Sequence, residues 1–183
     1  MKELSLNILD ITENSVKAGA TLVEIFLTET DESLTIEISD NGSGMTEEVR
    51  RSVIDPFYTT RTTRKVGLGI PLFKFAAEQT GGGIEIESRQ IDLHPDDHGT
   101  RVKATFFKGH IDFTPLGDVK STLTTLVQGH PDIDFHYLHT FGERTAELDT
   151  RAIRAVLEGI PLDSYEILLW IGENIEEQYQ GFN

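Results

Sequence analysis

The chain has 183 residues, a formal net charge of −15 and no cysteine. Disulfides, cysteine-ligated zinc and a thiol nucleophile are therefore excluded, and the acidic balance disfavours nucleic acid as a partner because it repels phosphate. No apolar run approaches the roughly 20 residues that span a bilayer, and the N-terminus carries acids where a signal peptide would be apolar. We therefore expect no membrane partner and a cytoplasmic location.

The first part of the chain alternates between helical and strand periodicity. In chain order the pattern predicts a helix over 2–18, strands over 20–28 and 33–39, a helix over 46–54, a mobile loop over 55–69, a helix over 68–81, and strands over 83–88 and 99–107. The short link between the first two strands predicts a hairpin. Thr46 is the expected cap of the second helix, which has acids in its first turn. These elements together predict a sheet with helices on one face.

The rest of the chain is less regular and more acidic. It contains a candidate helix over 118–129, an alternating strand over 133–141, and two amphipathic helices on either side of Pro161. Residues 1–109 carry 12 basic and 18 acidic side chains, whereas residues 110–183 carry four and 13. We therefore predict an α+β fold with two domains: residues 1–109, and a small acidic α/β accessory segment over 110–183.

Three polar residues share one edge of the first helix. Asp10, Asn14 and Lys17 follow one another at spacings of four and three, beside the apolar stripe. An amide oxygen is a suitable Mg²⁺ ligand, an amine neutralises a phosphate oxygen, and a carboxylate can accept a proton from water. On its own the pattern also fits a solvated helix edge, which is the more common case.

Two glycine-rich segments could hold a nucleotide. Asp40 ends a strand and is followed by Asn-Gly-Ser-Gly-Met, where an acid could accept a hydrogen bond from an adenine amino group and the glycines permit positive φ. An ordinary Asx turn would use the same residues. Gly67 and Gly69 precede a helix, whose N-terminal amides could face phosphate, although tight turns use the same spacing.

The order and spacing of these segments resemble the GHKL superfamily, which includes sensor histidine kinases, MutL-type mismatch-repair ATPases, gyrase-type topoisomerases and anti-sigma serine kinases. ENSVKAGAT resembles the N-box, DNGSGM the G1 box, DPFYTTR the F-box and KVGLGI the G2 box, and the Gly-Thr of HGTRVKATF resembles the final box. The resemblance covers about residues 1–108. It implies a two-layer α/β sandwich of the GHKL ATPase and histidine kinase catalytic domain type, with ATP and Mg²⁺ as cofactors.

The resemblance also assigns the phosphate end of the site. Asn14 would ligate the Mg²⁺ that bridges the ATP phosphates, and Lys17 would lie near phosphate. The lid over the nucleotide would begin at Phe57, and the phosphates would lie against Gly67, Leu68 and Gly69.

At the adenine end, the resemblance implies that Asp40 binds the amino group of the base, together with a water and Thr100. The slot for the base would be lined by Gly42, Gly44 and Met45.

Asp10 bears on whether the site is catalytic. In the ATPase branch of the superfamily a glutamate four residues before the Mg²⁺-binding asparagine activates water, and here Asp10 holds that position with a side chain one methylene shorter. Asp10 is therefore the catalytic candidate, with an exposed helix Asp as the alternative. Three functions stay open: a regulatory module or kinase acting on a separate protein, a small ATPase that switches a partner, and a non-catalytic nucleotide-binding scaffold.

The remaining candidates carry less chemistry. His94 and His98 flank two aspartates in a polar loop and are interpreted as solvated loop residues rather than metal ligands. His136 and His139 are interpreted as decorating their strand. Residues 168–171 on the last helix are expected in a core or an interface. The acidic tail is the expected surface for a protein partner, and a homodimer interface also stays open.

Overall fold

The computed structural model describes residues 3–55 and 67–182. Its helices are α1 (Leu4–Lys17), α2 (Glu47–Ile54), α3 (Gly69–Gln79), α4 (Val119–Gly129), α5 (Thr150–Leu157) and α6 (Tyr165–Gln180). Its strands are β1 (Leu22–Glu29), β2 (Ser33–Asp40), β3 (Gly83–Arg89), β4 (Gly99–Phe107), β5 (Asp134–Phe141) and β6 (Arg144–Asp149).

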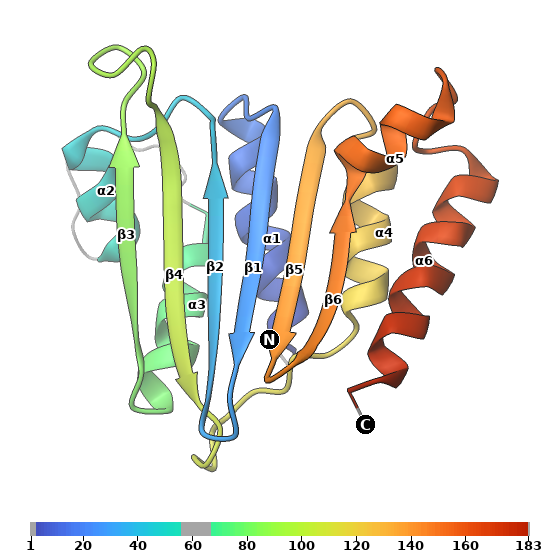
Figure 1. The fold of residues 1–183 in the computed structure, drawn as a ribbon. Coiled ribbons are helices and arrows are strands. Elements are labelled where there is room, and N and C mark those ends of the chain that lie inside the picture. The colour runs from blue at the N-terminus through green and yellow to red at the C-terminus, as the bar shows by residue number, and fades with distance from the viewer. Residues whose placement is uncertain (1–2, 56–66, 183) are drawn as a thin grey trace.

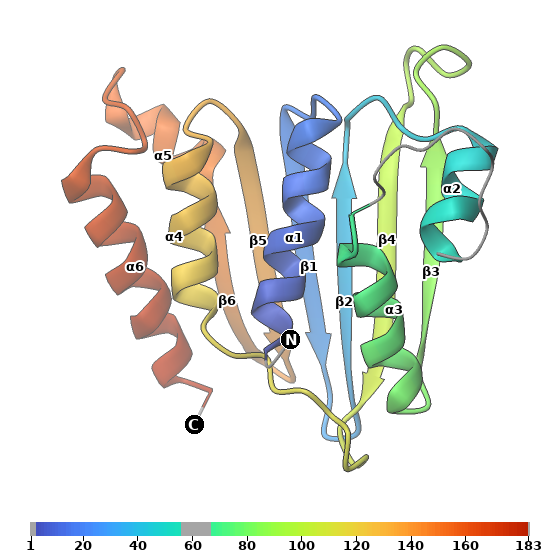
Figure 2. The ribbon, with the colours of Figure 1, turned by 180° about the vertical axis from the view of Figure 1, so that it is seen from behind.

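The strands form one six-stranded sheet in the order β3-β4-β2-β1-β5-β6. Only the β1–β5 pair is parallel among these neighbours; the others are antiparallel. Figures 1 and 2 show that α1, α2, α3, α4 and α6 lie along one face of the sheet, with α1 at the centre of this layer, while the short helix α5 lies at the end of β5. The prediction of a two-layer α+β arrangement is therefore confirmed.

The predicted hairpin of the first two strands is also confirmed. β1 and β2 pair antiparallel, with Val23 opposite Asp40 at one end and Glu29 opposite Leu34 at the other. Both strands bury alternate residues, so the apolar side chains face the helices. The core consists of these side chains together with apolar residues of α1, α3, α4 and α6.

Helix boundaries follow local capping chemistry. The Thr46 hydroxyl accepts a hydrogen bond from the Val49 amide at 3.2 Å, which confirms the predicted cap of α2. Asp118 caps α4 in the same way, through the Ser121 amide at 2.8 Å.

Within the described ranges, no helix combines the length and the apolar character that crossing a membrane requires.

The acidic tail continues the same sheet. β5 lies parallel to β1 along the whole strand, from Leu22 opposite Asp134 to Glu29 opposite Phe141. α4 packs on both α1 and α6, and all three contribute to the common core. The tail is thus the small α/β extension that was predicted, while a domain boundary at residue 109 stays a prediction.

β6 was not predicted from the sequence. Of its six residues only Ala146 and Leu148 are buried, and the other four have charged or hydroxyl side chains. Two apolar residues are too few to show a strand-like alternation in the sequence. The strand exists because β5 offers it a partner edge, with His136 opposite Asp149 and Phe141 opposite Arg144.

Candidate functional site

The C-terminal half of α1 faces the N-terminus of α3. A Cβ built on Gly69, the first residue of α3, would lie 3.3 Å from Asp10 Cβ and 3.8 Å from Asn14 Nδ2. Gly69 is buried, Asn14 half-buried and Asp10 exposed. The structure therefore brings together Asp10, Asn14 and Gly69, which are far apart in the sequence. The first-turn amides of α3 begin beside the Asn14 amide, an arrangement that suits an anion and its counter-cation.

Asp40, at the end of β2, is held by three hydrogen-bond donors. Its Oδ1 accepts from the Gly42 amide at 2.9 Å and from the Thr100 amide at 3.2 Å. Its Oδ2 accepts from the Ser15 hydroxyl at 2.6 Å. Because Ser15 follows Asn14 on α1, this last bond ties the adenine-binding candidate to the metal-binding candidate. The carboxylate keeps further lone pairs, since each oxygen can accept more than one hydrogen bond.

The turn after β2 requires glycine at two positions. Gly42 is buried, and a Cβ there would lie 3.0 Å from the Ala18 carbonyl oxygen and 3.1 Å from Asp40 Oδ1. Gly44 has φ +69°, and a Cβ there would overlap the backbone carbonyl of Arg89. The turn consequently packs directly on the C-cap residue of α1 and on the junction of β3 with the β3–β4 loop.

The β3–β4 loop, residues 90–98, clamps this turn. The Ile91 amide donates to the Ser43 carbonyl at 2.9 Å, and His98 Nδ1 donates to the Gly42 carbonyl at 2.5 Å. At the end of β3, the Ser88 hydroxyl accepts from the Met45 amide at 2.8 Å. Ser88 Oγ also lies 2.8 Å from Thr100 Oγ1. Met45 and Thr100 are thereby positioned around Asp40.

The structure says less about three residues that were predicted to lie near the phosphates. Lys17 lies in the last turn of α1 and is exposed. Gly67 and Leu68 immediately precede α3, where Leu68 is 66% exposed. Phe57, the predicted start of the lid, lies outside the described residues. The roles of all four stay predictions.

Sequence reasoning missed the residues that hold the site together, namely Ser15, Ser88 and His98. Ser15 left one signal, because it falls within the apolar stripe of the first helix. A serine at a buried position needs a polar partner, and that partner is Asp40. Ser88 had no comparable signal, because its partner Met45 lies 43 residues away in the sequence. The interpretation of His98 as a solvated loop residue is wrong, because its side chain is half-buried and bonds the Gly42 carbonyl, 56 residues away.

The residues present fit a purine nucleotide with a divalent cation. Asp40 offers an oriented acceptor, and glycines keep backbone close to it. Asn14, next to Ser15 on α1, places its side-chain amide at the N-terminus of α3. A cavity of about 140 Å³ lies at the adjoining strand ends, lined by Asp40, Ser88 and Thr100 among others. We base the site on this arrangement of donors, acceptors and glycines rather than on cavity size.

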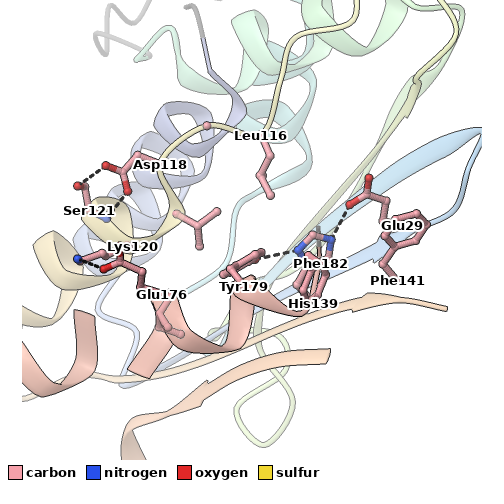
Figure 3. Close-up of a pocket in the computed structure, with 13 residues that line it drawn as sticks. Glu29, Leu116, Asp118, Lys120, Ser121, His139, Phe141, Glu176, Tyr179 and Phe182 are labelled. Carbon is pink, nitrogen blue, oxygen red and sulfur yellow. Dashed lines mark hydrogen bonds and ion pairs between the residues drawn. The ribbon is translucent and has the colours of Figure 1, made fainter. Parts of the chain in front are cut away.

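A larger cavity, of about 640 Å³, lies between the start of α4 and the end of α6 (Figure 3). His139 of β5 forms one wall and is 1% exposed, so the interpretation that it decorates its strand is wrong. Its Nε2 donates to Glu29 at 2.9 Å, and its Nδ1 accepts from the Tyr179 hydroxyl at 2.8 Å. Lys108 pairs with the other oxygen of Glu29 at 2.5 Å.

Burial lowers the pKa of His139, while the Glu29 carboxylate acts in the opposite direction. The folded chain therefore holds this imidazole neutral at pH values where the unfolded chain, with a pKa near 6.5, binds a proton. Because the unfolded state binds more protons, we expect the free energy of unfolding to fall as the pH drops below about 6.5, by at most about 1.4 kcal/mol per pH unit.

The pH prediction is checked by urea unfolding at several pH values between about 5 and 8. His139→Gln, which keeps a donor and an acceptor, should flatten the pH dependence relative to the parent. The exposed loop histidine His94 provides the matched control, and His94→Gln should keep the parent slope. Identical slopes for the parent and His139→Gln would contradict the assignment.

A family model described as histidine kinase-, DNA gyrase B- and HSP90-like ATPase matches residues 2–110. The chain is 35% identical over 74 residues to the nitrogen regulation protein NtrY of Azorhizobium caulinodans, covering 40% of the chain and 9% of that protein. It is 31% identical over 108 residues to sporulation kinase A of Bacillus subtilis, covering 59% of the chain and 16% of that protein. The chain therefore spans only a small part of these relatives.

Two solved structures share the fold. The Aquifex aeolicus MutL ATPase domain, complexed with ADP, has a TM-score of 0.52 at 15% identity, covering 98% of this chain and 70% of that one. The N-terminal domain of a DNA repair protein has a TM-score of 0.50 at 16% identity, covering 81% of this chain and 53% of that one. At these identities the likeness shows the fold alone. The match to the MutL domain covers 98% of this chain, so the shared fold includes the acidic tail.

Proposed function

We propose that this chain, which belongs to the family of histidine kinase-, DNA gyrase B- and HSP90-like ATPases, is an ATP- and Mg²⁺-binding regulatory module or protein kinase that acts on a separate protein partner. The observation that carries the proposal is the Asp40 carboxylate, oriented by Ser15, Gly42 and Thr100 at the end of β2. The MutL ATPase domain, which shares the fold, was solved with ADP, and this supports an adenine nucleotide as the ligand.

Each part of the nucleotide would meet a different group of residues. Asp40 would accept a hydrogen bond from the adenine amino group, with Met45 against the base. The amide oxygen of Asn14 would hold Mg²⁺, and the first-turn amides of α3 after Gly69 would face the phosphates. ATP supplies a phosphoryl group that can be transferred to a hydroxyl, an imidazole or water.

A phosphotransfer assay tests the regulatory or kinase function. Proteins that co-purify with the chain in the presence of ATP and Mg²⁺ are incubated with it and ATP labelled in the γ-phosphoryl group. We expect label to appear on a partner, and to be lost with the Asn14→Ala variant. Tight ATP binding without label on any partner, and without ADP release, would leave a non-catalytic scaffold as the function.

A small ATPase is the second candidate, and the position of Asp10 favours it. Asp10 precedes Asn14 by one helical turn, and its Cβ lies 3.3 Å from the position of a Cβ on Gly69, at the start of α3. A carboxylate there could accept a proton from a water molecule that attacks the terminal phosphate.

We expect Asp10→Asn to abolish steady ADP release while ATP affinity stays within about twofold of the parent, because Asp10 is exposed and the change removes only a proton acceptor. Coupled-enzyme ADP detection and calorimetric ATP titration measure the two quantities. Glu13→Gln, a change of the same kind on the same helix, is the control. Unchanged ADP release in Asp10→Asn would remove Asp10 from the catalytic step.

A further inference from the structure

The cavity between α4 and α6 has the size and lining of a binding pocket. Its volume of about 640 Å³ lies within the range of ligand sites. One end is aromatic, since the ring centroids of His139 and Tyr179 each lie within 5 Å of that of Phe182, at 4.9 and 4.8 Å. Leu116, Val119 and Ile175 add apolar lining. Figure 3 shows the aromatic side chains on one side of the cavity and a polar group on the other.

The aromatic wall is preorganised by partly buried hydrogen bonds. The Tyr179 hydroxyl lies 2.5 Å from that of Tyr137 and 2.8 Å from His139 Nδ1, so α6 is anchored to β5 at this point. His139 is anchored in turn to Glu29 on β1. A pocket whose walls are already fixed loses little conformational entropy when it takes up a side chain or ligand.

The polar side of the cavity is acidic. Asp118 and Glu176 line it with Lys120, which is already paired with Glu176 at 2.6 Å. Glu173, about one helical turn before Glu176 on α6, adds a further exposed carboxylate. Residues 155–183 contain six acidic side chains and no lysine or arginine. The potential at the cavity mouth is therefore negative, which attracts cations and repels phosphates.

Two exposed apolar side chains lie on the side of α6 that also reaches this cavity. Tyr165, Leu169, Gly172 and Glu176 follow one another at spacings of four, three and four, so they share one side of the helix. Gly172 packs against α4, with a Cβ position 3.1 Å from Lys120 Cε, and Glu176 lines the cavity. Tyr165 and Leu169 are 74% and 49% exposed. The α4–α6 side of the molecule thus combines exposed apolar side chains, an acidic edge and a preformed pocket.

We propose that the α4–α6 groove, by which we mean the cavity together with the exposed side chains of Tyr165 and Leu169 on α6, docks a positively charged segment of a partner protein, with one apolar anchor side chain of that segment in the cavity. The proposal deepens the proposed function and rests on it for the existence of a separate partner. The occupant follows from charge complementarity and from the aromatic lining, because arginine and lysine beside aromatic or aliphatic anchors match both features. A second copy of this chain, with its net charge of −15, would be repelled.

The test uses the 183-residue chain and fluorescein-labelled peptides of about 12 residues, with lysines and one central tryptophan. Matched peptides carry glutamate in place of lysine, or alanine in place of tryptophan. Fluorescence anisotropy at low and moderate salt measures affinity. We expect the basic tryptophan peptide to bind at least about tenfold more tightly than either matched peptide, and its binding to weaken with salt.

Substitutions in the chain test where the peptide binds. Glu173→Lys with Glu176→Lys, and separately Leu169→Ser, should each weaken the peptide at least about fivefold. The charge-matched control, Glu85→Lys with Asp96→Lys, changes exposed acids of β3 and the β3–β4 loop and should stay within about twofold. Equal weakening by the control pair would mean non-specific attraction and would overturn the proposal, as would concentration-dependent dimerisation lost in Leu169→Ser.

ATP binding is measured on the same samples, so that the two proposals can fail separately. If the chain binds ATP but binds all three peptides equally, only the proposal about the groove is overturned. Peptide binding that follows the variants while ATP does not bind would overturn the proposed nucleotide function and leave the groove in place.

Discussion

Replacing Asp40 with asparagine is expected to weaken ATP binding at least about 100-fold without unfolding the chain. The asparagine oxygen can still accept from the Gly42 and Thr100 amides, and its NH₂ group can donate to the Ser15 hydroxyl, which accepts as readily as it donates. The local structure is therefore kept. The NH₂ group would, however, present a donor to the adenine amino group, which is itself a donor.

Calorimetric titration with ATP and Mg²⁺, together with thermal unfolding, measures both parts of this prediction. Glu37→Gln is a matched control, because it makes the same chemical change on β2 at a residue paired with Arg101 on the opposite face of the sheet. ATP affinity equal to that of the parent in Asp40→Asn would remove the nucleotide from the end of β2.

Replacing Gly44 with alanine is expected to lower the free energy of unfolding by about 2–4 kcal/mol. Part of the loss comes from φ +69°, which disfavours any side chain. The rest comes from overlap of the new methyl group with the Arg89 carbonyl, which is backbone and cannot turn aside. Relief of the overlap would separate the turn from the β3–β4 loop, so ATP affinity should fall as well.

Urea unfolding measures this loss, and Gly109→Ala is its control. Gly109 has no positive φ, and a Cβ there would meet no atom within 4 Å. We expect the control to change stability by no more than about 0.5 kcal/mol. If Gly44→Ala also changed the free energy of unfolding by no more than about 0.5 kcal/mol, the turn would not be held against the loop.

Local sequence patterns were sufficient to predict most helices and strands of residues 3–55 and 67–107. Alternation in β1 and β2 identified the buried face of each strand, and the threonine before α2 identified its cap. These features depend on neighbours a few residues away, so they are visible in the sequence. The same holds in part for the Asp40 turn, where Gly44 is favoured by its positive φ.

Partners across the fold were not visible in this way. Alternation showed that β5 is a strand, but not that it would lie parallel to β1. It also did not show that His139 faces inward to Glu29 and Tyr179. A period of two defines two faces of a strand, and only the neighbouring elements decide which face is covered.

The sequence by itself determined the family, the order of the nucleotide-site segments and the glycines that the turn after β2 needs, because each depends on residue types at short spacings. The tertiary structure alone decided that Ser15 holds Asp40, that the β3–β4 loop clamps the turn, and that α4 and α6 enclose a pocket. These contacts join residues tens of positions apart, and they form only when the helices pack on the completed sheet.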